Sequence, residues 1–126
     1  MPVRTDFEQW LAAQFTDTGA FTIFIVLVRI SGEQVAAVKS TYAQMIGDDM
    51  SWREMAALLD GARTPWDAVA FFVGLGAGGP LIDSVARNKL RDIEASVTAD
   101  PLALNRGMFF DRNGRHLQVD EVAGRG

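Results

Sequence analysis

The chain of 126 residues has no cysteine and only one histidine. Without cysteine it can form neither disulfides nor thiolate metal sites, and it has no thiol nucleophile. The absence of disulfides agrees with a reducing compartment. The N-terminal segment also lacks the unbroken apolar stretch of a secretory signal. We therefore expect a cytoplasmic protein.

Basic residues and long apolar runs are also scarce. Sixteen Asp and Glu outnumber twelve Lys and Arg, and the net charge is −4. Binding to a phosphate backbone requires a basic patch, so we expect no nucleic-acid partner. The most apolar run, residues 21–30, is about ten residues long, well short of the roughly 20 that a membrane-spanning helix requires. We expect no membrane partner either.

The composition is that of one folded domain. Hydrophobic residues make up 48% of the chain, and a chain of this length buries roughly two thirds of its unfolded surface. Residues 1–126 are therefore predicted to form a single compact domain. The tail at 123–126 has nothing to anchor it and is expected to fray.

Residues 21–30, with the sequence Phe-Thr-Ile-Phe-Ile-Val-Leu-Val-Arg-Ile, predict a central β-strand. The run is rich in β-branched residues, which favour strands. Alternation places Phe21, Ile23, Ile25 and Leu27 on one face, and Phe24, Val26, Val28 and Ile30 on the other. Because both faces are apolar, other layers must cover the strand on both sides.

Three capping-box patterns predict helix starts. They lie at Thr5–Glu8, Ser31–Gln34 and Ser51–Glu54, each with Ser or Thr followed three residues later by Glu or Gln. Apolar residues at helical spacing follow each one, so we predict helices up to about residues 16, 46 and 60. The alternative joins residues 21–46 into one long helix, since their apolar residues approximate a seven-residue pattern. That alternative makes the protein mostly α with a C-terminal β-hairpin.

The second half of the chain predicts a strand, a helix and a hairpin. Residues 65–73 fit a helix start or a buried strand, and we favour the strand because glycines follow directly. A helix is predicted after Pro80. Asn113-Gly114 favours a two-residue hairpin turn that pairs Phe110 with Leu117 and Met108 with Val119. A three-residue loop with a bulge at Gly114 would instead place Phe109 beside Leu117.

Together these elements predict an α+β fold. We expect a small mixed sheet of about four strands, including the C-terminal hairpin, packed with about four helices in the order α-β-α-α-β-α-β-β.

The glycine-rich loop at 74–79 is the clearest candidate for a ligand site. Gly74, Gly76 and Gly79 match G-x-G-x-x-G, with Gly78 in addition, and such loops can cradle a phosphate on free amides. The dinucleotide fold, however, needs a second parallel strand with an acidic residue at its end, which this sequence lacks. Pro80 also removes one amide. Phosphate, nucleotide or small-metabolite binding by this loop is therefore the alternative hypothesis.

No residues predict catalysis or a metal site. His116 is expected opposite Asp111 on the exposed side of the hairpin, where it has no pocket or nucleophile. The acidic pairs Asp48-Asp49 and Asp120-Glu121 lack further oxygen ligands at a recognisable spacing. We accordingly predict no catalytic residue, no metal ligand and no cofactor.

By elimination, the expected function is protein–protein interaction or self-association by a non-catalytic domain. Apolar and aromatic side chains are abundant for such a small chain, and tryptophan is favoured at interface hot spots. We expect Trp10 and Trp52 in the core. Trp66, beside Pro65, is expected to be partly exposed and, with Phe109, to contact a partner or a second copy of the chain.

Overall fold

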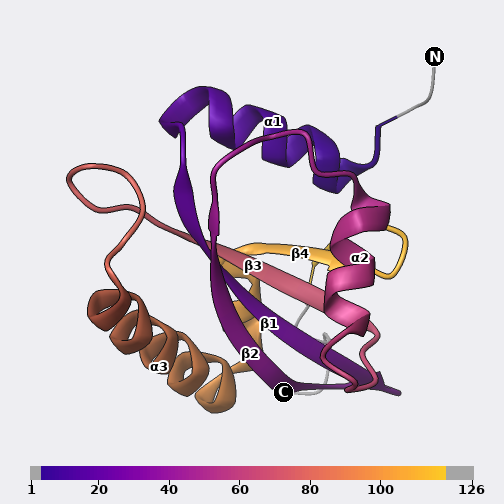
Figure 1. Cartoon of the computed structure of the whole chain (residues 1–126). Coiled ribbons are helices and arrows are strands. Elements are labelled where there is room, and N and C mark those ends of the chain that lie inside the picture. The colour runs from indigo at the N-terminus through magenta and orange to yellow at the C-terminus, as the bar shows by residue number, and fades with distance from the viewer. Residues whose placement is uncertain (1–3, 119–126) are drawn as a thin grey trace.

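The computed structural model describes residues 4–118, which fold into three layers with a five-stranded sheet in the middle (Figure 1). The predicted α+β class is confirmed, but the sheet is antiparallel throughout rather than mixed. The strand order is β2-β1-β3-β4-β5. Along the chain the elements are α1 (Asp6–Thr18), β1 (Phe21–Ser31), β2 (Gln34–Met45), α2 (Trp52–Asp60), β3 (Ala68–Gly74), α3 (Asp83–Ala99), the 3-10 helix η1 (Pro101–Arg106), β4 (Met108–Asp111) and β5 (His116–Leu117).

Strand β1 is the centre of the fold, as its sequence predicts. It pairs with β2 on one side and with β3 on the other, and residues 21–28 are all buried. Phe21, Ile23, Ile25 and Leu27 lie in the core shared with α1 and α2, while Phe24, Val26 and Val28 face α3 and η1. Ile30 lies beyond these layers, with 39% of its surface exposed.

The helix predicted behind Ser31 is wrong, because residues 34–45 form the edge strand β2. Gly32 takes a φ of 58°, which suits a tight hairpin turn, and Ser31 pairs directly with Gln34. The alternative of one long helix over residues 21–46 is wrong for the same reason. The sequence contained a local signal for a helix start, but a strand at 34–45 pairs with β1 along its whole length. A helix there would leave that edge of the buried strand β1 without backbone partners.

Helices α1 and α2 begin where their capping boxes predict. Thr5 and Ser51 both close capping boxes, with Glu8 and Glu54 respectively. Asp100 caps η1 by accepting from the amide of Leu102. None of the helices within residues 4–118 is long and apolar enough to cross a membrane.

The C-terminal hairpin adopts the alternative register. Phe109 pairs with Leu117 and Phe110 with His116, so the predicted pairing of Phe110 with Leu117 is wrong. Gly114 takes a φ of 77°, and the Asp111 side chain accepts from the amides of Asn113 and Arg115. These contacts fit a three-residue loop ending in a glycine bulge. The predicted partner Val119 and the tail at 123–126 lie outside the described residues.

Candidate functional site

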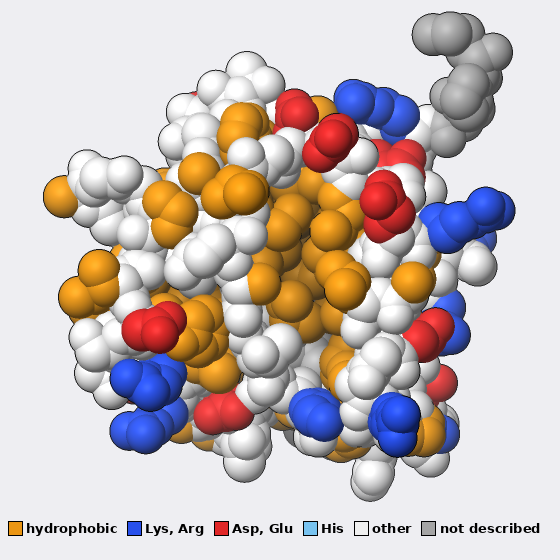
Figure 2. Space-filling view, viewed as in Figure 1, with side chains coloured by type: hydrophobic (Ala, Val, Ile, Leu, Met, Phe, Trp, Pro, Cys, Tyr) orange, Lys and Arg blue, Asp and Glu red, His pale blue; other side chains and the backbone are white. Residues whose placement is uncertain are grey.

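An apolar groove lies between helix α2 and strands β1 and β2, with a volume of about 330 Å³. Figure 2 shows the groove as a hollow in the middle of this face, lined by hydrophobic side chains. We call it the α2 groove. Ile23, Ile25 and Leu27 from β1 form its floor. Its walls are formed by Lys39, Ser40, Thr41, Ala43, Gln44 and Met45 from β2, by Met50, and by Met55, Leu58, Leu59 and Ala62 from α2 and its end.

The groove exists because helices cover this face of the sheet incompletely. Helix α2 buries Trp52, Met55 and Leu59 against the sheet, but β2 lies beyond it at the edge. Leu58 on the groove wall remains 63% exposed, and Ile46, directly after β2, is 80% exposed. Large apolar side chains at the rim of an apolar hollow are typical of a binding surface.

The outer edge of β2 borders the groove and has no strand neighbour among the described residues. Lys39 is the one charged residue in this twelve-residue strand, and its Nζ donates to the carbonyl of Ala62, 3.1 Å away. The register shift opposite Leu27 and Val28 leaves Val38 as a bulge. Natural edge strands are usually protected by short length, charges, proline or bulges. Beyond the bulge, residues 39–45 form a regular edge with little such protection.

The two ends of the groove carry opposite charge. Asp48 and Asp49 follow Met45 at one end, and both are exposed. Lys39 lies at the other end, where Arg63 follows the lining residue Ala62. Within residues 4–118 no ion pair includes any of these four side chains, so their charge is available to a partner.

Several amides in and directly after the glycine-rich loop already donate hydrogen bonds within the protein. The amides of Gly76 and Gly79 donate to each other's carbonyls, at 2.6 Å and 3.4 Å, and the amide of Leu81 donates to the buried hydroxyl of Thr22 at 2.8 Å. Gly74 belongs to β3, while Gly78 has open space where a Cβ would lie. Helix α3 begins only at Asp83. Phosphate binding by this loop stays a prediction.

Trp66 is buried, so its predicted exposure is wrong. Only 5% of its surface is accessible, its Nε1 donates to Asp60 Oδ1 at 2.9 Å, and the Arg112 guanidinium lies 4.0 Å from the centre of its ring. Arg112 also pairs with Asp60 at 2.9 Å. The hydrogen bonds from Arg112 and Trp66 lower the pKa of Asp60 below its ordinary value.

The remaining sequence candidates also lie apart from the groove. Phe109 is 2% exposed and packs in the α3-side core, so it offers no surface to a partner in this fold. His116 lies opposite Phe110 rather than Asp111, and its amide donates to Asp6. No cluster of three or more potential metal ligands occurs within residues 4–118.

The sequence did not predict the groove. The groove forms only if residues 34–45 are a strand, whereas the sequence pattern predicted a helix there. The pattern that could have indicated it is Gly32 at a hairpin position, between two segments rich in Val, Ile, Thr and Tyr. Among the described lining residues Lys39 is the one ionisable side chain, so this lining suits apolar binding rather than acid–base chemistry.

None of the protein-family models, curated proteins or solved structures compared with this chain matches it.

Proposed function

We propose that this domain is a binding module that associates through the β2 edge and the adjoining α2 groove, and that its partner is a second copy of the chain. The observation that carries the proposal is an apolar groove beside a strand edge to which no other described strand is paired. Burying such a groove against a partner releases water from apolar surface, and pairing the edge satisfies its free backbone groups.

Two features support a second copy as the partner. A strand edge is self-complementary under a two-fold rotation, because antiparallel pairing with its own copy satisfies both edges at once. That rotation also brings the acidic end of one groove, at Asp48 and Asp49, toward the basic end of the other, at Lys39 and Arg63. Opposite charges placed in this way favour the antiparallel arrangement over a parallel one.

The proposed interface places Ala43 close to the two-fold axis, since the regular part of the edge spans residues 39–45. Ala43 is exposed, and it faces the groove because it pairs with Ile23. A charge introduced there would lie close to its own copy. Ala43→Glu is expected to weaken association at least about tenfold, because two like charges would be buried together.

Analytical ultracentrifugation over a range of protein concentrations tests the proposal. Ala43→Lys should weaken association as Ala43→Glu does, and an equimolar mixture of the two variants should recover it. Val85→Glu is the matched control, because Val85 is 46% exposed on α3 at the other face of the sheet. A monomer at every concentration, or a mixture that fails to recover association, would refute this assembly.

A further inference from the structure

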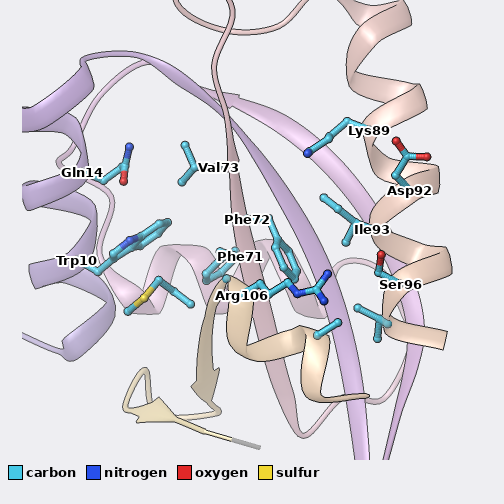
Figure 3. A pocket seen from close by; sticks show the side chains of 14 residues that line it. Trp10, Gln14, Phe71, Phe72, Val73, Lys89, Asp92, Ile93, Ser96 and Arg106 are labelled. Carbon is cyan, nitrogen blue, oxygen red and sulfur yellow. The ribbon is translucent and has the colours of Figure 1, made fainter. Parts of the chain in front are cut away.

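A second cavity, of about 480 Å³, lies beside β3 between α1 and α3 (Figure 3). Strand β4 pairs with residues 68–71 of β3, so within the described range 4–118 residues 72–74 have no strand neighbour on that side. Helices α1 and α3 extend past this gap on opposite faces of the sheet. We call the resulting cavity the edge cleft. Its volume falls within the range of about 300–1,000 Å³ that is typical of small-molecule sites.

Aromatic and aliphatic side chains form much of the edge cleft. Trp10 lies on the α1 side, Phe72 and Val73 on β3, and Ile93 on α3. The Trp10 ring stacks on Phe71 with an interplanar angle of 6° and 5.8 Å between centroids. The stacking holds the indole in place, so the cleft presents a fixed aromatic surface to a ligand.

The charged groups of the cleft are two cations and one anion. Lys89 and Asp92 come from α3, and Arg106 comes from the end of η1. All three are exposed, and none forms an ion pair with another residue in the range 4–118. Figure 3 shows the Lys89 side chain extending from α3 toward β3. The lining therefore has a formal excess of positive charge, although the whole chain carries −4.

We propose that the edge cleft binds a small amphipathic anion. Its apolar body, preferably aromatic, lies against Trp10 and Phe72, and its carboxylate or phosphate is held by Lys89 and Arg106. A peptide strand added to β3 is the less favoured occupant, because the open edge of β3, as far as the described residues show it, is the three-residue stretch 72–74. The cleft lies on the opposite side of β1 from the β2 edge, so this proposal does not depend on the proposed self-association.

A matched set of naphthalene compounds tests the ligand class by isothermal titration calorimetry. The set consists of 2-naphthoate, 2-naphthyl phosphate, neutral 2-naphthol and the cation 2-naphthylmethylammonium. At least one anion should bind about tenfold more tightly than 2-naphthol, and the cation should bind most weakly. Comparing the two anions distinguishes a carboxylate ligand from a phosphate ligand. Equal affinities for the anions and for 2-naphthol would overturn the proposal.

Surface variants locate the bound anion, and all of them change exposed side chains. Lys89→Gln and Arg106→Gln should each weaken anion binding about fivefold and leave 2-naphthol unaffected, whereas Asp92→Asn should tighten anion binding. Arg91→Gln is the control, because it removes one positive charge from α3 outside the lining residues.

Two results would contradict the assignment. One is a loss of affinity in Arg91→Gln as large as that in the two cleft variants. The other is binding of an extended acidic peptide without binding of any naphthalene compound, which would assign the cleft to strand addition.

Discussion

Replacing Gly114 with alanine should destabilise the fold strongly, because this glycine lies where three elements meet. It closes the β4–β5 loop with a φ of 77°, and its carbonyl accepts from the amide of Phe7 in α1 at 3.1 Å. A Cβ at this position would lie 2.8 Å from Cγ of Trp52 in α2. The indole has little room to retreat, because its Nε1 donates to the carbonyl of Arg112 and its ring packs edge-on against Phe7.

The expected loss in the free energy of unfolding has two parts. The left-handed backbone conformation costs a residue with a Cβ about 1–2 kcal/mol. Overlap with a fixed ring adds about 1–3 kcal/mol, so Gly114→Ala should lower the free energy of unfolding by about 2–5 kcal/mol. Gly32→Ala separates the two parts, because Gly32 has a φ of 58° but a Cβ added there would meet no heavy atom within 4 Å. Gly32→Ala should lower the free energy of unfolding by about 1–2 kcal/mol.

Urea unfolding followed by far-UV circular dichroism measures both losses without relying on tryptophan fluorescence. Gly78→Ala is a third variant, with open space and no positive φ, and should change stability by less than about 0.5 kcal/mol. If Gly114→Ala and Gly32→Ala agree within about 0.5 kcal/mol, the packing of Trp52 over the hairpin loop is refuted.

Two further predictions concern the hydrogen bond that Thr22 accepts from Leu81 and the hydrogen bonds that Glu8 accepts, one of which joins α1 to α2. Thr22→Val should lower the free energy of unfolding by about 1–3 kcal/mol, because it leaves the amide of Leu81 without its acceptor. Thr22→Ser keeps the hydroxyl and should retain most of the stability. Urea unfolding of both variants checks this prediction. Hydrogen bonds from the amides of Trp52 and Thr5 lower the pKa of Glu8 below its ordinary value of 4.5. The stabilisation from the ionised Glu8 is therefore present above pH 4.5 and is lost as the pH falls through the lowered pKa. The stability difference between the natural protein and Glu8→Gln should shrink from pH 7 to about pH 3, and a constant difference in urea midpoint would contradict this.

Local signals in the sequence predicted several elements well. The capping boxes at Thr5 and Ser51 fixed two helix starts, because the hydrogen bonds of a cap join residues only three apart. The apolar run at 21–30 indicated a strand buried on both faces. Its alternation assigned Phe21 and Phe24 to opposite cores, since strand geometry sets side-chain direction residue by residue.

The same kind of local signal was misleading at Ser31. Its spacing to Gln34 matches a capping box, yet those two residues pair across a hairpin turn. The hairpin at 108–117 shows a similar limit, because Asn113-Gly114 fits both a two-residue and a three-residue loop. Contacts from distant segments favour the longer loop, above all Phe7 and Trp52 against Gly114.

The sequence by itself determined the α+β class, the buried central strand and two helix starts, because each depends on neighbouring residues and on the period of the apolar pattern. Only the tertiary structure decided the α2 groove and the edge cleft. Both arise where one element leaves part of its neighbour uncovered. Helix α2 does not cover the edge strand β2, and β4 pairs with residues 68–71 of β3 but not with residues 72–74. Such gaps depend on how segments far apart in the chain are placed beside one another, which no local pattern specifies.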